Sequence, residues 1–509
     1  MSLLGNLSVV SGATLVSRIL GLLRDILFFA TFGATIYGEV FLLAFTIPNL
    51  FRRLLGEGTL TSSFVPVFSN LLFSKKKSIS DELINKVFTR LVIFLGILSV
   101  SICFISWLAF EAEFFSEKKW HLASLLNCVI FPYVLFICLA SILVGALNVH
   151  GKFIEGAISP VLLNGVLIIV LSVGLFSETK NLKTFVIFLS LSVVCAGFLQ
   201  FLIPWFSMKK VFHWNWAFDT KSNEHFQKVS SLFWVGALGA GVAQINILFS
   251  RLFAYSLDDI GGVSFLYMSS RLVELPLGLF AIALTTVLFP RLTKASHTND
   301  SKDFNASFFL GLRVIAAFSI PASCGLFFLP SLVIGVLFEW NQFGASEVQM
   351  ASKILQISAW TIPAYALSTF LVKAHHSRKN MRSPLHAALI SLIFNIAGCL
   401  FLAGTMGVEG LALANLMAAF AQTIFLSFTS KNLSLHSIIS HKKIALLKTL
   451  VASFVMSASI LLMQSFLSFE VNKLENLLNL SILMIVSIVI YLSVLKLFRF
   501  DWFNQKPLQ

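Results

Sequence analysis

Residues 47–68 read IPNLFRRLLGEGTLTSSFVPVF, with two adjacent arginines and a glutamate set between strongly apolar runs. The apolar run begins near Glu39, and Arg52 follows 13 residues later, which is about 20 Å along a helix. A loop at Arg52 would leave only about 12 residues before it, too few to cross roughly 30 Å of hydrocarbon. The stretch therefore predicts one span over 39–73, kinked at its prolines and glycines. A re-entrant loop is the alternative.

The composition of the whole chain is that of a polytopic membrane protein. Of its 509 residues, 57% are hydrophobic and 12% are charged, whereas soluble domains carry about 25% charged residues. Apolar runs of about 18 residues or more, each long enough to cross a bilayer, recur from end to end. We predict an all-α fold, because the strands of a membrane β-barrel would alternate apolar and polar residues in segments of about ten.

The apolar runs predict about fourteen transmembrane helices. Their expected ranges are 5–31, 39–73, 86–110, 121–148, 157–177, 183–206, 229–255, 262–290, 307–337, 349–374, 384–404, 407–429, 446–468 and 476–497. Alternate connections are rich in lysine and arginine, and the others are acidic or balanced. Because basic loops stay on the cytoplasmic side, we expect both termini to be cytoplasmic and the chain to lie in the bacterial inner membrane.

The predicted spans divide into two six-helix lobes and an addition. We expect an N-lobe over 1–206, a cytoplasmic linker over 207–228, a C-lobe over 229–430, and a C-terminal pair of helices with a tail over 431–509. A shift of 224 residues aligns spans one and two with spans seven and eight, as in a duplicated transporter. The matching residues are Phe29-Ala30 with Phe253-Ala254, Gly38 with Gly262, Leu60-Thr61 with Leu284-Thr285, and Pro66 with Pro290.

Charged residues inside the spans are the candidate functional residues, because a charge at the bilayer centre costs about 2.5–3.5 kcal/mol and normally faces a protein interior or a water-filled cavity. The first span contains SRILGLLRD, in which Ser17, Gly21, Arg24 and Asp25 lie near one helical face. The remaining candidates, from the first, second and eighth spans, are Arg18, Glu39, Arg52, Arg53, Glu57, Arg271 and Glu274.

The sum of the intramembrane charges is positive. Five arginines at positions 18, 24, 52, 53 and 271 stand against the acids Asp25, Glu57 and Glu274. A purely structural network would tend towards neutrality, since an unpaired buried charge is costly. Excess arginine favours an anionic ligand, because the guanidinium fork binds phosphate or carboxylate through two hydrogen bonds. Short basic loops and the intramembrane arginines account for the net charge of +14. We therefore exclude nucleic acid as a partner.

The same residues carry a family resemblance. SRILGLLRD, PNLFRRLLGEGTLTSSFVP, GALNVHGKF with SPVLLN at 145–164, and SFLYMSSRLVELPLGLFAIALTTVLFP at 264–290 resemble the MurJ (MviN) family of lipid II flippases. The resemblance implies the multidrug/oligosaccharidyl-lipid/polysaccharide exporter fold, with two lobes around a cationic cavity and a lipid-facing groove at the last two spans. It also implies that undecaprenyl-diphosphate-linked peptidoglycan precursor crosses the membrane by alternating access.

The resemblance also implies roles for single residues. Arg18, Arg24, Arg52 and Arg271 match the cavity arginines, with Arg53 beside them, as substrate-binding residues. Asp25 matches an acid at the periplasmic gate, and Glu39, Glu57 and Glu274 are expected as gate residues or counter-charges. Ser250-Arg251 stands where some relatives carry a sodium-binding acid, so no sodium site is expected.

Other functions are weaker fits to the sequence. A flippase for another polyprenyl-diphosphate-linked glycan, such as an O-antigen unit, is the alternative, because its head group carries the same anion. An enzyme would need a positioned base, nucleophile or metal, and the histidines lie mainly in or beside loops without a partnered carboxylate motif. We predict no catalytic residue, metal or cofactor. The expected partners are lipid II and membrane lipids, with cell-wall synthesis proteins as further candidates.

Overall fold

The computed structural model describes residues 3–56, 59–74, 77–114, 117–177, 181–212, 214–216, 218, 224–257, 259–298, 300–430, 438–467 and 473–500. Within these ranges all regular structure is helical, and the predicted all-α fold is confirmed. The chain forms two compact units. Unit 1 comprises Met1–Leu248 with Trp340–Phe343, and unit 2 comprises Phe249–Glu339 with Gly344–Gln509. We describe each unit by itself, and the predicted division into lobes and linker stays a prediction.

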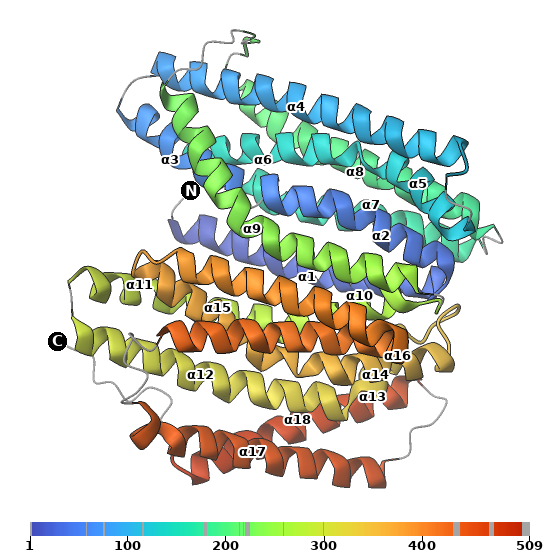
Figure 1. The fold of residues 1–509 in the computed structure, drawn as a ribbon, viewed down its shortest axis with the longest axis vertical. Helices are drawn as coiled ribbons and strands as arrows, with labels where there is room; N and C mark the ends of the chain where they lie inside the picture. The colour runs from blue at the N-terminus through green and yellow to red at the C-terminus, as the bar shows by residue number, and fades with distance from the viewer. Residues whose placement is uncertain are drawn as a thin grey trace. The chain divides into compact units, whose positions relative to one another are not determined.

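Unit 1 is built from the first nine α-helices, of which the last continues into unit 2. They are α1 (Leu3–Phe32), α2 (Ile36–Phe51), the π-helical η1 (Arg52–Gly56), α3 (Thr59–Phe73), α4 (Lys77–Glu111), α5 (Lys118–Ile130), α6 (Tyr133–Val149), α7 (Ile154–Phe176), α8 (Leu182–Lys209) and α9 (Glu224–Ser256). Within unit 1, α1 packs against α7, and α8 packs against both α6 and α7 (Figure 1).

Unit 2 begins within α9 and contains the remaining elements. They are α10 (Gly262–Pro276), the π-helical η2 (Leu277–Ala281), α11 (Ile282–His297), α12 (Ser301–Phe328), α13 (Pro330–Phe338), α14 (Ala345–Ala359), α15 (Thr361–Ser377), α16 (Arg382–Thr429), α17 (Ile438–Phe466) and α18 (Lys473–Leu497). The last two helices pack on each other, and α17 also packs against α12 (Figure 1). Their buried side chains form one cluster with those of α12 and α13.

The described residues include 10 helices that are long and apolar enough to cross a membrane, or up to 11 when α9, bent by 43°, is counted as one span. These helices coincide with predicted spans. The predicted first and second spans correspond to α1 and to the run α2–η1–α3, which are outside that set. A polytopic helical membrane protein is therefore confirmed, and the count of fourteen stays a prediction.

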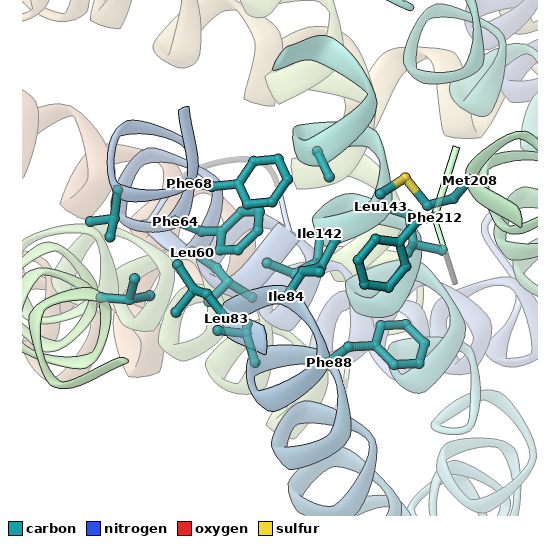
Figure 2. Packing of buried hydrophobic residues seen from close by; sticks show 14 of the residues in the cluster. Leu60, Phe64, Phe68, Leu83, Ile84, Phe88, Ile142, Leu143, Met208 and Phe212 are labelled. Atoms are coloured by element: carbon teal, nitrogen blue, oxygen red, sulfur yellow. The ribbon is translucent and has the colours of Figure 1, made fainter. Parts of the chain in front are cut away.

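The core of unit 1 gathers apolar side chains from α3, α4 and α6. Figure 2 shows Phe64 and Phe68 beside each other, with Leu83, Ile84 and Ile142 packed close by. All five side chains are nearly inaccessible to solvent. This cluster fixes α3, and so the end of the charged second run, against two long neighbouring helices.

Part of the predicted linker packs into the same cluster. Phe212 is buried, and Trp214 stacks on Trp205 with ring centroids 4.8 Å apart. Phe88 of α4 lies 4.7 Å from the Trp214 ring. The first residues after α8 therefore belong to the packed body of unit 1, because three aromatic rings hold them there.

The stretch 47–68 is helical through its arginines. Pro48 lacks a backbone N–H, but its carbonyl still accepts a hydrogen bond from the Arg52 N–H, which also donates to the Asn49 carbonyl. Residues Arg52–Gly56 then form η1, and the Thr59 hydroxyl donates to the Leu54 carbonyl. The predicted helical backbone at the two arginines is confirmed over 52–56, and the kink stays a prediction. A π-helical turn widens the backbone and commonly marks a functional site.

Unit 2 repeats this arrangement. Shifting η1 by the 224 residues of the sequence repeat gives 276–280, and η2 occupies Leu277–Ala281, one residue further on. The same shift carries the end of α3 at Phe73 onto the end of α11 at His297. Each unit therefore has one helical run that is interrupted by a π-helical turn, which supports the pseudo-symmetry predicted from sequence.

The 48-residue α16 is a helical hairpin. Gly407 has φ 55° and ψ −133°, a conformation outside the helical region. A Cβ placed on Gly398 would lie 2.7 Å from Cβ of Ala414, although 16 residues of straight helix would separate them by about 24 Å. The chain therefore reverses at Gly407, and Figure 1 draws the two arms in orange. The two predicted spans 384–404 and 407–429 correspond to these arms.

Four residues from far along the chain complete unit 1. The Gln342 N–H donates to the Ala30 carbonyl at 3.2 Å, and Phe343 packs edge-on against Phe29. Both rings are almost fully buried. Gly33 makes this contact possible, because its φ is +60° and an added Cβ would lie 2.4 Å from the Gln342 carbonyl oxygen. We call Trp340–Phe343 the strap.

Gly33→Ala is expected to lower the stability of unit 1. The left-handed backbone conformation alone costs a non-glycine residue about 1–3 kcal/mol, and the clash with the Gln342 backbone adds to it. The measurement is the thermal unfolding midpoint of the purified chain. Gly96→Ala in α4 is the control, since nothing lies within 4 Å of its added Cβ. Equal midpoints for the two variants would contradict the role of Gly33.

Candidate anion site

Arg24 is the most buried of the predicted arginines. It is 9% exposed, and its Nε and one terminal nitrogen donate to Oδ1 of Asp25 at 3.0 and 2.6 Å. Its other terminal nitrogen donates to Oδ1 of Asn164 on α7 at 2.9 Å. The guanidinium is thus held by one carboxylate and one neutral amide, so the amide adds orientation without cancelling charge.

Asn164 ties the arginine to the fold. Its Nδ2 donates to the Ser17 carbonyl at 3.1 Å, so one amide group contacts α1 at two points seven residues apart. The small residue Gly21 lies between them, and an added Cβ there would sit 3.6 Å from the Asn164 nitrogen. The close packing of α1 on α7 therefore depends on the same face of SRILGLLRD that carries the charges.

Arg18 differs from Arg24 in its exposure to solvent. Its side chain is exposed on α1, and no hydrogen bond or ion pair involves it among the residues that the structure describes. On α1, an exposed guanidinium thus precedes a buried one by six residues, which is about 1.7 helical turns. The shared face predicted for the first span includes Arg24 and does not include Arg18, in agreement with this difference.

Arg52 and Arg53 open the π-helical turn. Both are half-buried, and Nε of Arg52 donates to Oδ1 of Asn49 at 2.9 Å. The turn packs against α6, where the Cys138 thiol lies 3.9 Å from the Phe51 carbonyl. As at Arg24, a neutral amide orients the guanidinium.

The structure describes Asp25 and Glu39 among the predicted acids of unit 1. Glu39 is 5% exposed in the first turn of α2, where the positive end of the helix dipole stabilises a carboxylate. Asp25 pairs with Arg24 as described. Glu57 lies outside the described residues. The predicted role of these acids as gate residues stays a prediction.

Arg271 belongs to unit 2 and has its own partners. Its Nε and one terminal nitrogen donate to the Tyr267 hydroxyl at 3.0 and 2.9 Å, and the other terminal nitrogen lies 3.3 Å from Oε2 of Glu274. The arginine and glutamate side chains are 33% and 50% exposed. Glu274, which was expected as a gate residue or counter-charge, therefore pairs with Arg271, and the Tyr267 phenol is a third member of this group.

The predicted departure at Ser250 is part of a neutral buried network. Asn395 donates to the Ser250 hydroxyl at 2.7 Å, and that hydroxyl donates to Oδ1 of Asn415 at 3.2 Å. These three residues join α9 to both arms of α16. Within the described parts of the chain, no three His, Cys, Asp or Glu side chains are grouped as a metal site.

Sequence reasoning gave no role to Asn164, Asn49 or Tyr267. Asn164 closes the SPVLLN motif, and an amide inside an apolar span is costly unless it is paired. This amide within an apolar span was the sequence signal that could have identified Asn164. Each of the three residues orients an arginine through a neutral oxygen, and Arg24 and Arg271 are also paired with the acids Asp25 and Glu274.

Comparisons with known proteins agree on one family. A family model described as lipid II flippase MurJ matches residues 28–486. A probable lipid II flippase MurJ of Vibrio cholerae is 32% identical over 431 residues, which cover 81% of this chain and 80% of the relative.

Solved structures give the same fold. A lipid II flippase MurJ in an inward closed conformation has a TM-score of 0.80 and 28% sequence identity, and the match covers 96% of this chain and 98% of that one. An inward-facing multidrug resistance MATE family transporter of the MOP superfamily has a TM-score of 0.66 at 11% identity, covering 83% and 96% of the two chains. The second likeness concerns the fold alone.

Proposed function

The chain belongs to the lipid II flippase MurJ family, and on that premise we propose that it moves lipid II from the cytoplasmic to the periplasmic leaflet of the inner membrane. Its substrate would be the undecaprenyl-diphosphate-linked disaccharide-pentapeptide. The covalent structure of the lipid does not change in this transfer. The relatives are named as flippases, and we propose no catalytic step.

The observation that carries the proposal is the way the arginines are held. Arg24, Arg52 and Arg271 each donate to a neutral oxygen, from Asn164, Asn49 and Tyr267. The neutral oxygen fixes the direction of each guanidinium, while Asp25 and Glu274 balance part of the charge at Arg24 and Arg271. The diphosphate can then exchange with those amide and phenol oxygens, because charge-assisted hydrogen bonds to phosphate are stronger than bonds to neutral acceptors.

We propose the following route for the lipid. The arginines at positions 18, 24, 52, 53 and 271 bind the diphosphate inside a hydrated cationic cavity. The polyprenyl tail stays in the bilayer beside the C-terminal helices of 431–509, since only the head group must be shielded from hydrocarbon. Alternating access, with Asp25, Glu39, Glu57 and Glu274 as gate residues or counter-charges, completes the transfer. Both termini are cytoplasmic in this arrangement.

The test is replacement of a depleted lipid II flippase. Cells that lose their own flippase are expected to grow when they express this chain, and vesicles containing the purified chain are expected to transfer labelled lipid II unchanged between leaflets. Growth failure despite normal membrane abundance, together with no transfer in vesicles, would refute the proposal. Transfer of an O-antigen lipid instead of lipid II would establish the alternative glycan.

A further inference from the structure

Tyr133 is a fully buried tyrosine of unit 1 whose hydroxyl has no hydrogen-bond partner among the residues that the structure describes. It lies midway along Lys118–Val149, a run of 32 residues that is long and apolar enough to cross a membrane. Most buried hydroxyl groups are hydrogen-bonded, because an unpaired one in an apolar interior is costly. An exception of this kind calls for a physical reason, and a binding role is one.

The ring of Tyr133 is fixed by its packing. A Cβ added to Gly197 of α8 would lie 2.5 Å from Cδ2 of Tyr133, so the ring lies directly against the α8 backbone. The ring of Phe45 on α2 has its centroid 6.1 Å from that of Tyr133. Because the hydroxyl lies on the axis of the ring, a ring flip does not move its oxygen. The position of the hydroxyl is therefore set by the fold of unit 1.

The start of α6 lies beside the π-helical turn that carries two of the predicted arginines. Phe131, two residues before Tyr133, packs edge-on against Phe51 with ring centroids 5.6 Å apart. The Cys138 thiol of α6 lies 3.9 Å from the Phe51 carbonyl. Phe51 directly precedes Arg52, and α6 packs against η1. Contacts on both sides of Tyr133 therefore hold it close to the beginning of the turn.

The charged neighbours of the phenol restrict the kind of group that can bond to it. The charges of Arg52 and Arg24 both act on Tyr133. An arginine side chain has five N–H donors and no acceptor, so neither guanidinium can accept the proton of the hydroxyl. A group that satisfies this hydroxyl must be an acceptor. Beside two cations an anionic acceptor is favoured over a neutral one.

We propose that the Tyr133 hydroxyl donates a hydrogen bond to the diphosphate of the transported lipid. This inference rests on the proposed function and adds an uncharged donor to the residues that hold the head group. A phenol O–H forms a short, directional bond with an anionic oxygen. Salt screens interactions between charges, and the phenol carries none, so its contribution to binding is expected to depend on ionic strength much less than that of an arginine.

The experiment measures two properties of the full chain in nanodiscs, its affinity for undecaprenyl diphosphate and its thermal unfolding midpoint. The variants are Tyr133→Phe and the control Tyr491→Phe, each of which removes one buried hydroxyl and keeps the ring. The Tyr491 hydroxyl donates to the Ala317 carbonyl at 2.6 Å within unit 2, so it has the partner that the Tyr133 hydroxyl lacks.

The two variants are expected to behave in opposite ways. Tyr133→Phe is expected to weaken lipid binding about tenfold, the effect of losing one hydrogen bond to a charged group, at low and at high salt. Its unfolding midpoint is expected to equal or exceed that of the original chain, because no hydrogen bond is lost and a buried polar group is removed. Tyr491→Phe is expected to lower the midpoint and to leave the affinity unchanged.

Three results would overturn the role of Tyr133 as a donor. Unchanged affinity in Tyr133→Phe is the first. A midpoint lowered as far as that of Tyr491→Phe, or failure of the variant to fold, is the second, because the hydroxyl would then stabilise the fold itself. A loss of affinity that disappears at high salt is the third. The proposed function is tested separately on the original chain, where absence of lipid II transfer in vesicles would refute it.

Discussion

Arg24→Ala is expected to abolish the ability of the chain to sustain cells that lack their own lipid II flippase. The substitution removes the guanidinium that contacts both Asp25 and Asn164. Breaking a buried ion pair costs about 3–5 kcal/mol, so part of the loss is one of folding. The remainder is loss of a proposed contact to the diphosphate.

A double variant separates these two parts. Arg24→Ala with Asp25→Asn removes the charge from both partners, and it is expected to recover most of the membrane abundance and thermal stability that Arg24→Ala loses. It is not expected to recover growth. Growth supported by the double variant would show that Arg24 acts only through the stability of the fold and has no part in transport.

Gly410→Ala is expected to remove most of the folded protein from the membrane. An added Cβ at Gly410 would lie 2.4 Å from the carbonyl oxygen of Leu402 and 2.8 Å from its carbonyl carbon. These are backbone atoms of the facing arm of α16, so a side-chain rotation cannot relieve the clash. Overpacking of this kind costs about 3 kcal/mol, and the polar network of Asn395 and Asn415 spans the same two arms.

The matched control for this prediction is Gly404→Ala. Gly404 lies in the first arm, six residues away, and nothing is within 4 Å of its added Cβ. It is expected to be neutral or slightly stabilising, because alanine favours the helix by about 1 kcal/mol over glycine. Membrane abundance and the unfolding midpoint are the measurements. A Gly410→Ala variant as stable as Gly404→Ala would mean that the arms are not in backbone contact.

The helices and the family could be predicted from sequence because their signals are local. Runs of apolar residues mark the spans, and the PNLFRRLLGEGTLTSSFVP motif identified the family that the comparisons confirm. The break predicted between 384–404 and 407–429 coincides with Gly407, which has φ 55° in the structure. Even the π-helical turns fall at positions related by the sequence repeat, although no residue pattern announces a π-helix.

The partners of the charged residues could not be predicted in the same way. Asn164 lies 140 residues from Arg24, and the pairing depends on α1 and α7 becoming neighbours, which no local pattern states. The Arg251 contact with Tyr267 likewise depends on how two helices face each other after their turn. The structure shows how the predicted arginines are held, and their binding roles stay predictions.

The strap has a consequence for how the protein is made. The continuous part of unit 1 ends at Leu248, and Trp340 follows about 90 residues later. At a synthesis rate of about 5–20 residues per second, the ribosome needs about 5–20 s to supply it. During that interval the end of α1 lacks the cover that Phe343 gives to Phe29. A nascent chain that stalls or is cut before residue 340 therefore lacks the ring that packs against Phe29 in the complete unit 1.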